Sequence, residues 1–299
     1  MKIFSGSSNK KLAGKIARHL NLDLSPVEIF VFPDGEKRIR IQEKVLGENC
    51  IVIQSASTPP DENYMELFIM IDALKRSGAQ SIRVLIPYLG YQRQDHVFRD
   101  GEAVSLEVIA NILKTVGMTE GFSFELHSPK IPEIFPVPMH QLSALPIFAE
   151  KIKKEFNLEE IVLVSPDMGG IRRIKEIAEL LGNIPYATIT KNRDLSSGEI
   201  NDSGLDGDVR GKMALMVDDM ISTGITMVDA TNLLIENGAK KVFAFATHGV
   251  FARDADKLLQ HSKIERVFVS DSVDIPAFKL FPKLEILSVS ETAAKALKE

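Results

Sequence analysis

The sequence predicts an α/β fold with two tandem domains, each built around a mainly parallel sheet flanked by helices. Short apolar runs alternate with amphipathic helical patterns along most of the chain, which favours crossover connections between parallel strands. Residues 77–91 resemble residues 237–251 at an offset of 160, and residues 3–17 share a plan of strand, loop and helix with residues 163–178. These pairs indicate a duplication, so we expect domains at 1–147 and 148–299.

Each expected element has its own signal. Strands are expected where short runs rich in apolar residues are followed by polar or turn residues. They are residues 2–6, 50–56, 81–88, 121–127, 160–166, 213–219, 241–248 and 266–272. Helices are expected where apolar residues recur at helical spacing, with Gly near several C-terminal ends. They are residues 10–20, 64–78, 106–117, 145–156, 171–182 and 226–238.

Composition excludes several classes of protein. The formal net charge of -5 argues against a general nucleic-acid binder, because that role needs a basic face. No apolar run has the length of a secretory signal or a membrane span, so a cytoplasmic protein without a membrane partner is expected. Cys50 is the only cysteine, which excludes a disulfide within the chain, and its apolar neighbours predict a core thiol.

The stretch ALMVDDMISTGIT at 214–226 predicts a sugar phosphate site. Ligands of parallel α/β sheets bind beyond the carboxyl ends of the strands, and the carboxylates of Asp218 and Asp219 suit a vicinal diol or a hydrated magnesium ion. A loop of small and hydroxylated residues at a helix N-terminus suits a phosphate. Those residues are Ser222, Thr223, Gly224 and Thr226. Phosphate beside diol indicates ribose 5-phosphate, whereas the competing interpretation is a strand-end cap followed by an N-cap.

This stretch resembles the phosphoribosyl pyrophosphate motif of type I phosphoribosyltransferases and of ribose-phosphate pyrophosphokinases. Further stretches resemble the pyrophosphokinase family in the same order along nearly the whole chain. They are FPDGE at 32–36, YQRQD at 91–95, ELHSP at 125–129, SPDMGG at 165–170 and TKNRD at 190–194. The resemblance implies two type I phosphoribosyltransferase-like domains. It also implies transfer of the pyrophosphoryl group of ATP to the 1-hydroxyl of ribose 5-phosphate, with Mg²⁺ as cofactor.

The resemblance also assigns roles to individual residues. It implies ATP contacts by Phe32, Asp34, Glu36, Arg93, Gln94 and Asp95, and magnesium ligands at His127 and Asp167. It implies a catalytic flexible loop beginning with Lys191 and Arg193. It implies ribose 5-phosphate contacts by Asp218, Asp219, Ser222, Thr223, Gly224, Ile225 and Thr226. Because the loop matching Phe32–Glu36 completes a neighbouring subunit's adenine pocket in the family, a homodimer or higher homo-oligomer is expected.

Ordinary structural roles compete with several of these assignments. FPDGE taken alone is a turn, Arg93 and Gln94 suit a solvated loop, and His127 suits a structural position at a strand end. Residues 191–212 lack apolar periodicity, which is typical of a lid or of a mobile surface loop. The chain departs from the family at Ile225, where relatives often carry Gly, and at His96, where many carry Lys. Two other functions stay open, a type I phosphoribosyltransferase and a non-catalytic regulatory homologue.

Overall fold

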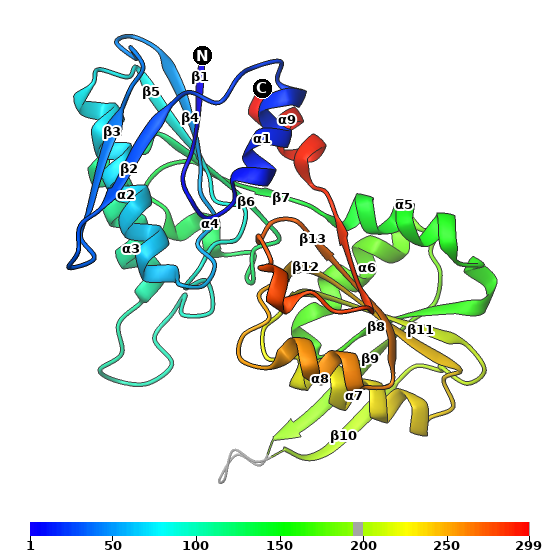
Figure 1. The fold of residues 1–299 in the computed structure, drawn as a ribbon. Coiled ribbons are helices and arrows are strands. Elements are labelled where there is room, and N and C mark those ends of the chain that lie inside the picture. The colour runs from blue at the N-terminus through cyan, green and yellow to red at the C-terminus, as the bar shows by residue number, and fades with distance from the viewer. Residues whose placement is uncertain (194–199, 299) are drawn as a thin grey trace. The chain divides into compact units, whose positions relative to one another are not determined.

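A computed structural model describes residues 1–193 and 200–298 and confirms the α/β fold class (Figure 1). The chain forms two compact units. The first contains Met1–Ser143, Ser272–Asp274 and Ser288–Glu299, and the second contains Ala144–Asp271 and Ile275–Leu287. Over the described ranges, no helix is long and apolar enough to cross a membrane.

The first unit is built on a five-stranded parallel sheet with the order β1-β4-β5-β6-β7. The strands are β1 (Lys2–Ser5), β4 (Asn49–Ile53), β5 (Ser81–Leu85), β6 (Glu120–Phe124) and β7 (Met139–Leu142). The helices are α1 (Lys10–His19), α2 (Pro60–Arg76), α3 (Ser105–Val116), α4 (Ile131–Ile134) and α9 (Ser290–Lys298). The continuous apolar run of β4 is buried, as is typical of a strand covered on both faces of a parallel sheet. Cys50 lies within it, and burial raises the pKa of its thiol to about 11.

A separate antiparallel hairpin consists of β2 (Val27–Val31) and β3 (Lys37–Ile41). In the described part of the chain it forms its own two-stranded sheet. Ile39 is buried in the core of the first unit, and Ile29 and Ile41 pack against that core. The sequence analysis expected only the turn between these strands.

The second unit contains a seven-stranded sheet with the order β10-β9-β8-β11-β12-β13-β14, parallel except where β10 meets β9. The strands are β8 (Ile161–Ser165), β9 (Tyr186–Arg193), β10 (Ile200–Asp206), β11 (Met213–Ile221), β12 (Lys241–Gly249), β13 (Ile264–Ser270) and β14 (Leu284–Leu287). The helices are α5 (Leu145–Glu155), α6 (Ile171–Leu180), α7 (Ile225–Glu236) and α8 (Ala255–His261). In Figure 1, α5 and α6 cover one face of this sheet and α7 and α8 the other.

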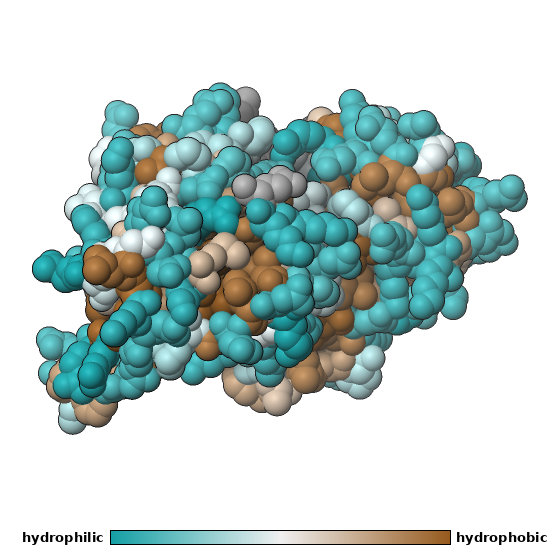
Figure 2. Space-filling view, turned by 90° about the horizontal axis from the view of Figure 1, so that it is seen from above, coloured by the Kyte–Doolittle hydropathy of each residue, from teal (hydrophilic) through white to brown (hydrophobic). Residues whose placement is uncertain are grey.

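The two units repeat one order of elements. In each, a first strand and helix are followed by an antiparallel hairpin, and the next strand lies beside the first strand in the sheet. Strands β1, β4, β5, β6 and β7 thus correspond to β8, β11, β12, β13 and β14. The tandem arrangement is confirmed. In Figure 2, hydrophilic residues cover most of the viewed face, as expected for units whose apolar strands are internal.

The C-terminal helix α9 belongs to the first unit, although it lies at the end of the second half of the sequence. Its Ala293, Ala294 and Leu297 are buried, and the helix packs beside α1. The functional division at 1–147 and 148–299 stays a prediction, and the compact units differ from it in this helix.

One expectation about a loop needs correction. Residues 191–212 were expected to be structureless, yet the backbone of residues 191–193 completes β9 and residues 200–206 form β10. Antiparallel pairing uses backbone groups, so a polar strand can form without the apolar alternation that sequence analysis detects.

Candidate functional site

Asp218 and Asp219 lie in the part of β11 that extends beyond its pairing with β8. Pairing of β11 with β8 ends at Met216, whereas pairing with β12 continues to Ile221. Asp218 and Asp219 therefore occupy a part of β11 that β8 does not cover. The Asp219 residue is only 3% exposed, and its backbone N–H donates to Oδ1 of Asp218 at 2.8 Å. The acids lie within the strand, as expected, at the carboxyl edge of the sheet.

Arg173 of α6 joins the acid pair, and sequence analysis missed it. Its Nη1 is 2.9 Å from Oδ1 of Asp218, and its Nη2 is 3.5 Å from Oδ1 of Asp219. The only available signal was its place on the helix that follows SPDMGG, because helical spacing does not reveal a partner 45 residues away.

The acid pair is electrostatically strained despite this arginine. Burial raises the pKa of Asp218 well above its usual range, the negative charge of Asp219 raises it further, and Arg173 opposes both. Asp167 adds a smaller upward contribution to the same pKa, which places a third carboxylate within electrostatic reach. A bound cation or hydroxyl donors would relieve this concentration of negative charge.

The loop between β11 and α7 has the geometry of an anion site. Gly224 has a φ of 80°, and a Cβ there would lie 3.3 Å from Cγ of Leu259, so both conformation and space favour glycine. Ile225 begins α7 and is not among the residues with positive φ, so its departure from the family pattern causes no backbone strain. Ser222, Thr223 and Thr226 are half-buried. N–H groups in the first turn of a helix have no intrahelical acceptor and face anions favourably.

Asp167 organises the loop that connects β8 to α6. Its side chain accepts from the N–H of Gly170 at 3.1 Å and caps the short 3₁₀ turn Met168–Gly170. Ser165 Oγ donates to the backbone oxygen of Asp167 at 2.7 Å. A Cβ on Gly170 would lie 2.4 Å from that Oγ and would displace it, which favours glycine there. Asp167 therefore has a structural role besides any contact with a ligand.

In the first unit a cavity of about 740 Å³ brings together three predicted residues, Arg93, Asp95 and His127. Its other lining residues are His96, Phe98, Ser128, Pro129, Lys130, Glu133 and Ile134. Gln94 does not line it, and its N–H instead donates to the backbone oxygen of Tyr91 at 3.0 Å.

Two further side chains belong to this region: Gln92, which sequence analysis missed, and His96, which it named as a departure from the family. Gln92 is buried, and its Oε1 accepts from the N–H of His127 at 3.0 Å, which fixes the backbone at the exposed histidine. His96 has Nδ1 2.6 Å from Oδ1 of Asp95.

The Phe32–Glu36 loop joins β2 to β3 and is exposed throughout. It closes on itself through the N–H of Phe32, which donates to the oxygen of Glu36 at 2.8 Å, and through Gly35, which has a φ of 93°. The guanidinium carbon of Arg38 lies 5.9 Å from the centre of the Phe32 ring, a cation–π contact that the sequence did not suggest. The exposed aromatic face and acids remain available to a nucleobase.

The structure describes the predicted catalytic residues and magnesium ligands only in part. The backbones of Lys191 and Arg193 belong to β9, but their side chains lie outside the described residues. His127 belongs to the first unit and Asp167 to the second. Within the described ranges, no three His, Cys, Asp or Glu side chains form a ready-made metal cluster.

Comparisons with known proteins identify the chain's relatives. Residues 1–117 match the N-terminal domain of ribose phosphate pyrophosphokinase, and residues 195–299 match the phosphoribosyl synthetase-associated domain. The ribose-phosphate pyrophosphokinase of Fusobacterium nucleatum is 41% identical over 99% of this chain and 94% of its own length, and that of Bacillus subtilis is 40% identical over 99% and 93%. The crystal structure of phosphoribosylpyrophosphate synthetase from Mycobacterium smegmatis matches with a TM-score of 0.93 and 34% identity, covering 99% of this chain and 97% of that one.

Proposed function

The chain belongs to the ribose-phosphate pyrophosphokinase family, and we propose that it transfers the pyrophosphoryl group of ATP to the 1-hydroxyl of ribose 5-phosphate. The products are 5-phosphoribosyl 1-pyrophosphate and AMP. The observation that carries the proposal is the acid pair on β11, with Asp219 buried and Asp218 half-buried, beside the N-terminus of α7. Diol and phosphate are the two chemical features of ribose 5-phosphate, and each finds a complementary group here.

Each part of this site has a role in binding the sugar phosphate. Asp218 and Asp219 accept hydrogen bonds from the vicinal hydroxyls, and Arg173 holds the two carboxylates in place. The loop from Ser222 to Thr226 binds the 5-phosphate with hydroxyls and with N–H groups at the start of α7. These contacts fix the orientation of the bound sugar. Its 1-hydroxyl therefore attacks as an already oriented group.

ATP is the proposed partner of the first-unit residues. Arg93 has the fork geometry that phosphate oxygens favour and lines the 740 Å³ cavity together with Asp95. The exposed ring of Phe32 offers a stacking face for adenine, and Asp34 and Glu36 accept from its exocyclic amine. Lys191 and Arg193 neutralise charge on the transferring group. Gln94 is a further proposed ATP contact. The 1-hydroxyl oxygen bonds to the β-phosphorus as the bond from that phosphorus to the α,β-bridging oxygen breaks. AMP leaves, and the hydroxyl proton is released to water.

Magnesium fits the chemistry of this donor set. Mg²⁺ prefers carboxylates, water and substrate phosphates to all-protein cages. The acids Asp167, Asp218 and Asp219 share one region of the second unit, and Asp167 raises the pKa of Asp218. We propose His127 and Asp167 as magnesium ligands. The ion would supply positive charge to the phosphate oxygens, while the protein's own residues orient the two substrates.

We further propose that the chain works as a homodimer or a higher homo-oligomer in which the Phe32–Glu36 loop completes a neighbouring subunit's adenine pocket. A subunit-mixing experiment tests this. An Asp34→Ala/Glu36→Ala protein and a Lys191→Ala/Arg193→Ala protein are each expected to be inactive. After subunit exchange, mixed dimers should contain one intact site and recover part of the activity. No recovery despite exchange verified by mass would contradict a shared site.

One assay decides the main proposal. The protein is incubated with ATP, Mg²⁺ and ribose 5-phosphate, and AMP and 5-phosphoribosyl 1-pyrophosphate are followed together. Equal amounts of both products are expected, with none when ribose 5-phosphate is omitted. AMP formation at the same rate without ribose 5-phosphate would contradict the proposal. Consumption of 5-phosphoribosyl 1-pyrophosphate with a nucleobase would favour a phosphoribosyltransferase, and no turnover would favour a regulatory homologue.

A further inference from the structure

The β2–β3 hairpin needs an attachment to the rest of the first unit. In the described part of the chain its two strands pair only with each other, so no ladder of backbone hydrogen bonds joins it to the five-stranded sheet. An isolated two-stranded hairpin is marginally stable in water. The position of the loop at its tip, Phe32–Glu36, therefore depends on side chains that reach from the hairpin into the unit.

Lys37 is one such side chain, and its place in the strand is unusual. Side chains alternate along β3, so Lys37 shares the inward face with Ile39 and Ile41 while Arg38 and Arg40 point outward. The Lys37 side chain is only 13% exposed, against 75% for that of Arg40. A lysine thus occupies a core-facing position directly after the last residue of the loop.

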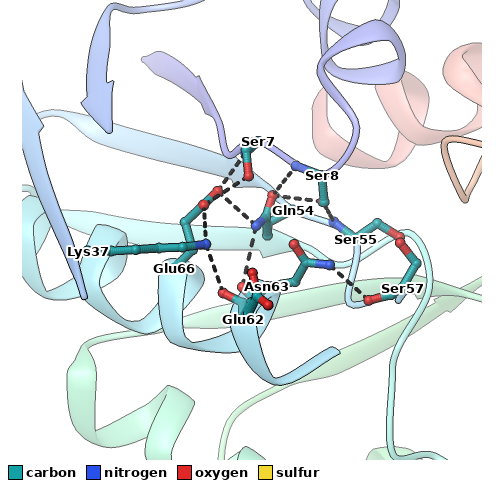
Figure 3. Close-up of polar contacts among 9 residues, drawn as sticks. All are labelled: Ser7, Ser8, Lys37, Gln54, Ser55, Ser57, Glu62, Asn63 and Glu66. Carbon is teal, nitrogen blue, oxygen red and sulfur yellow. Dashed lines mark hydrogen bonds and ion pairs between the residues drawn. The ribbon is translucent and has the colours of Figure 1, made fainter. Parts of the chain in front are cut away.

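Lys37 reaches a buried carboxylate on α2 (Figure 3). Its Nζ lies 2.8 Å from Oε2 of Glu66 and 3.3 Å from the backbone oxygen of Glu62. The Glu66 side chain is only 1% exposed. A buried charge of this kind is tolerated only when it is paired and hydrogen-bonded.

Glu66 is in turn fixed by the core of the unit. It accepts from the N–H of Ser7 at 2.6 Å, from the hydroxyl of Ser7 at 2.8 Å and from Nε2 of Gln54 at 3.0 Å. Gln54 Oε1 accepts from the N–H and the hydroxyl of Ser8, and Ser8 Oγ accepts from the N–H of Ser55 (Figure 3). These donors come from the loops that follow β1 and β4. Lys37 therefore bonds to a carboxylate that is also held by donors from two separate loops.

We propose that Lys37 is a positioning residue, whose ion pair with Glu66 fixes the Phe32–Glu36 loop and thereby sets the affinity for the adenine nucleotide. The nucleotide part of this inference rests on the proposed function. Lys37 contacts no substrate in this scheme. It acts through Glu36, its neighbour in the chain, because a loop held in its binding position loses less conformational entropy when the base arrives.

The test compares Lys37→Met with Arg40→Met, which removes an outward cation from the same strand. Three quantities are measured in the full-length protein: amide hydrogen exchange of residues 27–41 without ligands, the Kd for ATP by calorimetry, and KM for both substrates. Lys37→Met should speed exchange in the hairpin and raise the Kd and KM for ATP roughly 5- to 30-fold. Its KM for ribose 5-phosphate and its kcat should change little, and Arg40→Met should match the parent.

A second variant guards against loss of folding. Lys37→Met leaves Glu66 without a cation, whereas Lys37→Met/Glu66→Gln removes both charges and leaves no unpaired one. The double variant should fold and show the same faster exchange and weaker ATP binding. Unchanged exchange in the double variant, or faster exchange with unchanged ATP affinity, would overturn the inference. If the parent protein makes no 5-phosphoribosyl 1-pyrophosphate, the proposed function fails, but exchange and the ATP Kd still decide the role of Lys37.

Discussion

The two units place buried acids in corresponding regions, and these acids differ in how they are satisfied. In the first unit, burial opposes ionisation of Glu66, but hydrogen bonds from Lys37 and Ser7 outweigh it and lower its pKa. In the second unit, burial and the neighbouring charge of Asp219 raise the pKa of Asp218, and Arg173 only partly compensates. One acid has enough donors within the protein, whereas the other acid is left short of positive charge.

The backbone requirements of the two regions are nevertheless alike. A Cβ on Gly6, in the loop after β1, would lie 2.2 Å from Oε1 of Gln54, and a Cβ on Gly170, in the loop after β8, would lie 2.4 Å from Oγ of Ser165. In both loops a Cβ would therefore displace a neighbouring side chain, which favours glycine at each position. The difference lies in the side chains: hydrogen bonds within the first unit satisfy Glu66, whereas the acid pair of the second unit carries excess negative charge.

The largest expected effect is a loss of kcat when Lys191, in the β9–β10 hairpin of the second unit, is replaced. The β2–β3 hairpin of the first unit is expected to affect ATP binding instead. If Lys191 meets charge that develops only during transfer, Lys191→Ala should lower kcat on the order of 10²- to 10³-fold while ATP binding changes little. Arg210→Ala removes an exposed cation that follows the same hairpin and is the matched control. Steady-state kinetics of both variants provide the comparison. A Lys191→Ala enzyme with full kcat would make residues 191–193 ordinary surface strand.

Replacement of Asp219 tests whether the acid pair of the second unit binds ribose 5-phosphate. Asp219→Ala should raise KM for ribose 5-phosphate roughly 10- to 100-fold, because hydrogen bonds to a charged group are worth about 1.5–3 kcal/mol. KM for ATP should change far less. Asp229→Ala, which removes an exposed acid from α7, should leave both values unchanged. Equal losses for the two substrates would contradict the assignment of Asp219 to the sugar.

Arg173 should produce a smaller effect of the same kind. Arg173→Met leaves the two carboxylates without their cation, so they repel each other and lose their fixed orientation. We expect KM for ribose 5-phosphate to rise roughly 5- to 30-fold. Lys175→Met removes an exposed cation from the same helix and should match the parent enzyme. An unchanged KM in Arg173→Met would show that the acid pair holds its geometry through β11 alone.

The sequence predicted the features that local patterns encode. The apolar runs identified the central strands. The acids with their small hydroxylated loop predicted a sugar phosphate site, and that assignment stays a prediction. Sequence analysis missed the β2–β3 strands because it relied on apolar runs, and in KRIRI only Ile39 and Ile41 are apolar. Sequence analysis also missed three residues whose partners lie far away in the chain, because no spacing rule connects such positions. They are Arg173, Lys37 and Gln92, with partners 45, 29 and 35 residues away. Partners of this kind follow from the topology of the sheet, which only the structure supplies.

The smallest expected effect concerns stability, where the two acids should respond with opposite signs. Because the folded pKa of Asp218 is raised above 3.8, the folded state binds the extra proton, and stability falls as pH rises through that window. Asp218→Asn should therefore raise the Tm of the ligand-free protein at pH 7 by roughly 2–4 °C, the shift that corresponds to about 1 kcal/mol, and the gain should vanish as pH falls toward 3.8.

For Glu66 the sign reverses. Its folded pKa is lowered below 4.5, so its stabilising contribution is present above that pH and is lost as pH falls through the folded pKa. Glu66→Gln should lower the Tm at pH 7, since it also leaves the charge of Lys37 buried without a partner. Calorimetry of both variants between pH 7 and pH 4 in metal-free buffer measures the two trends. If Asp218→Asn were the less stable protein at pH 7, the acid pair would not be the strained charge that a ligand relieves, and the contrast between the two units would fail at its central point.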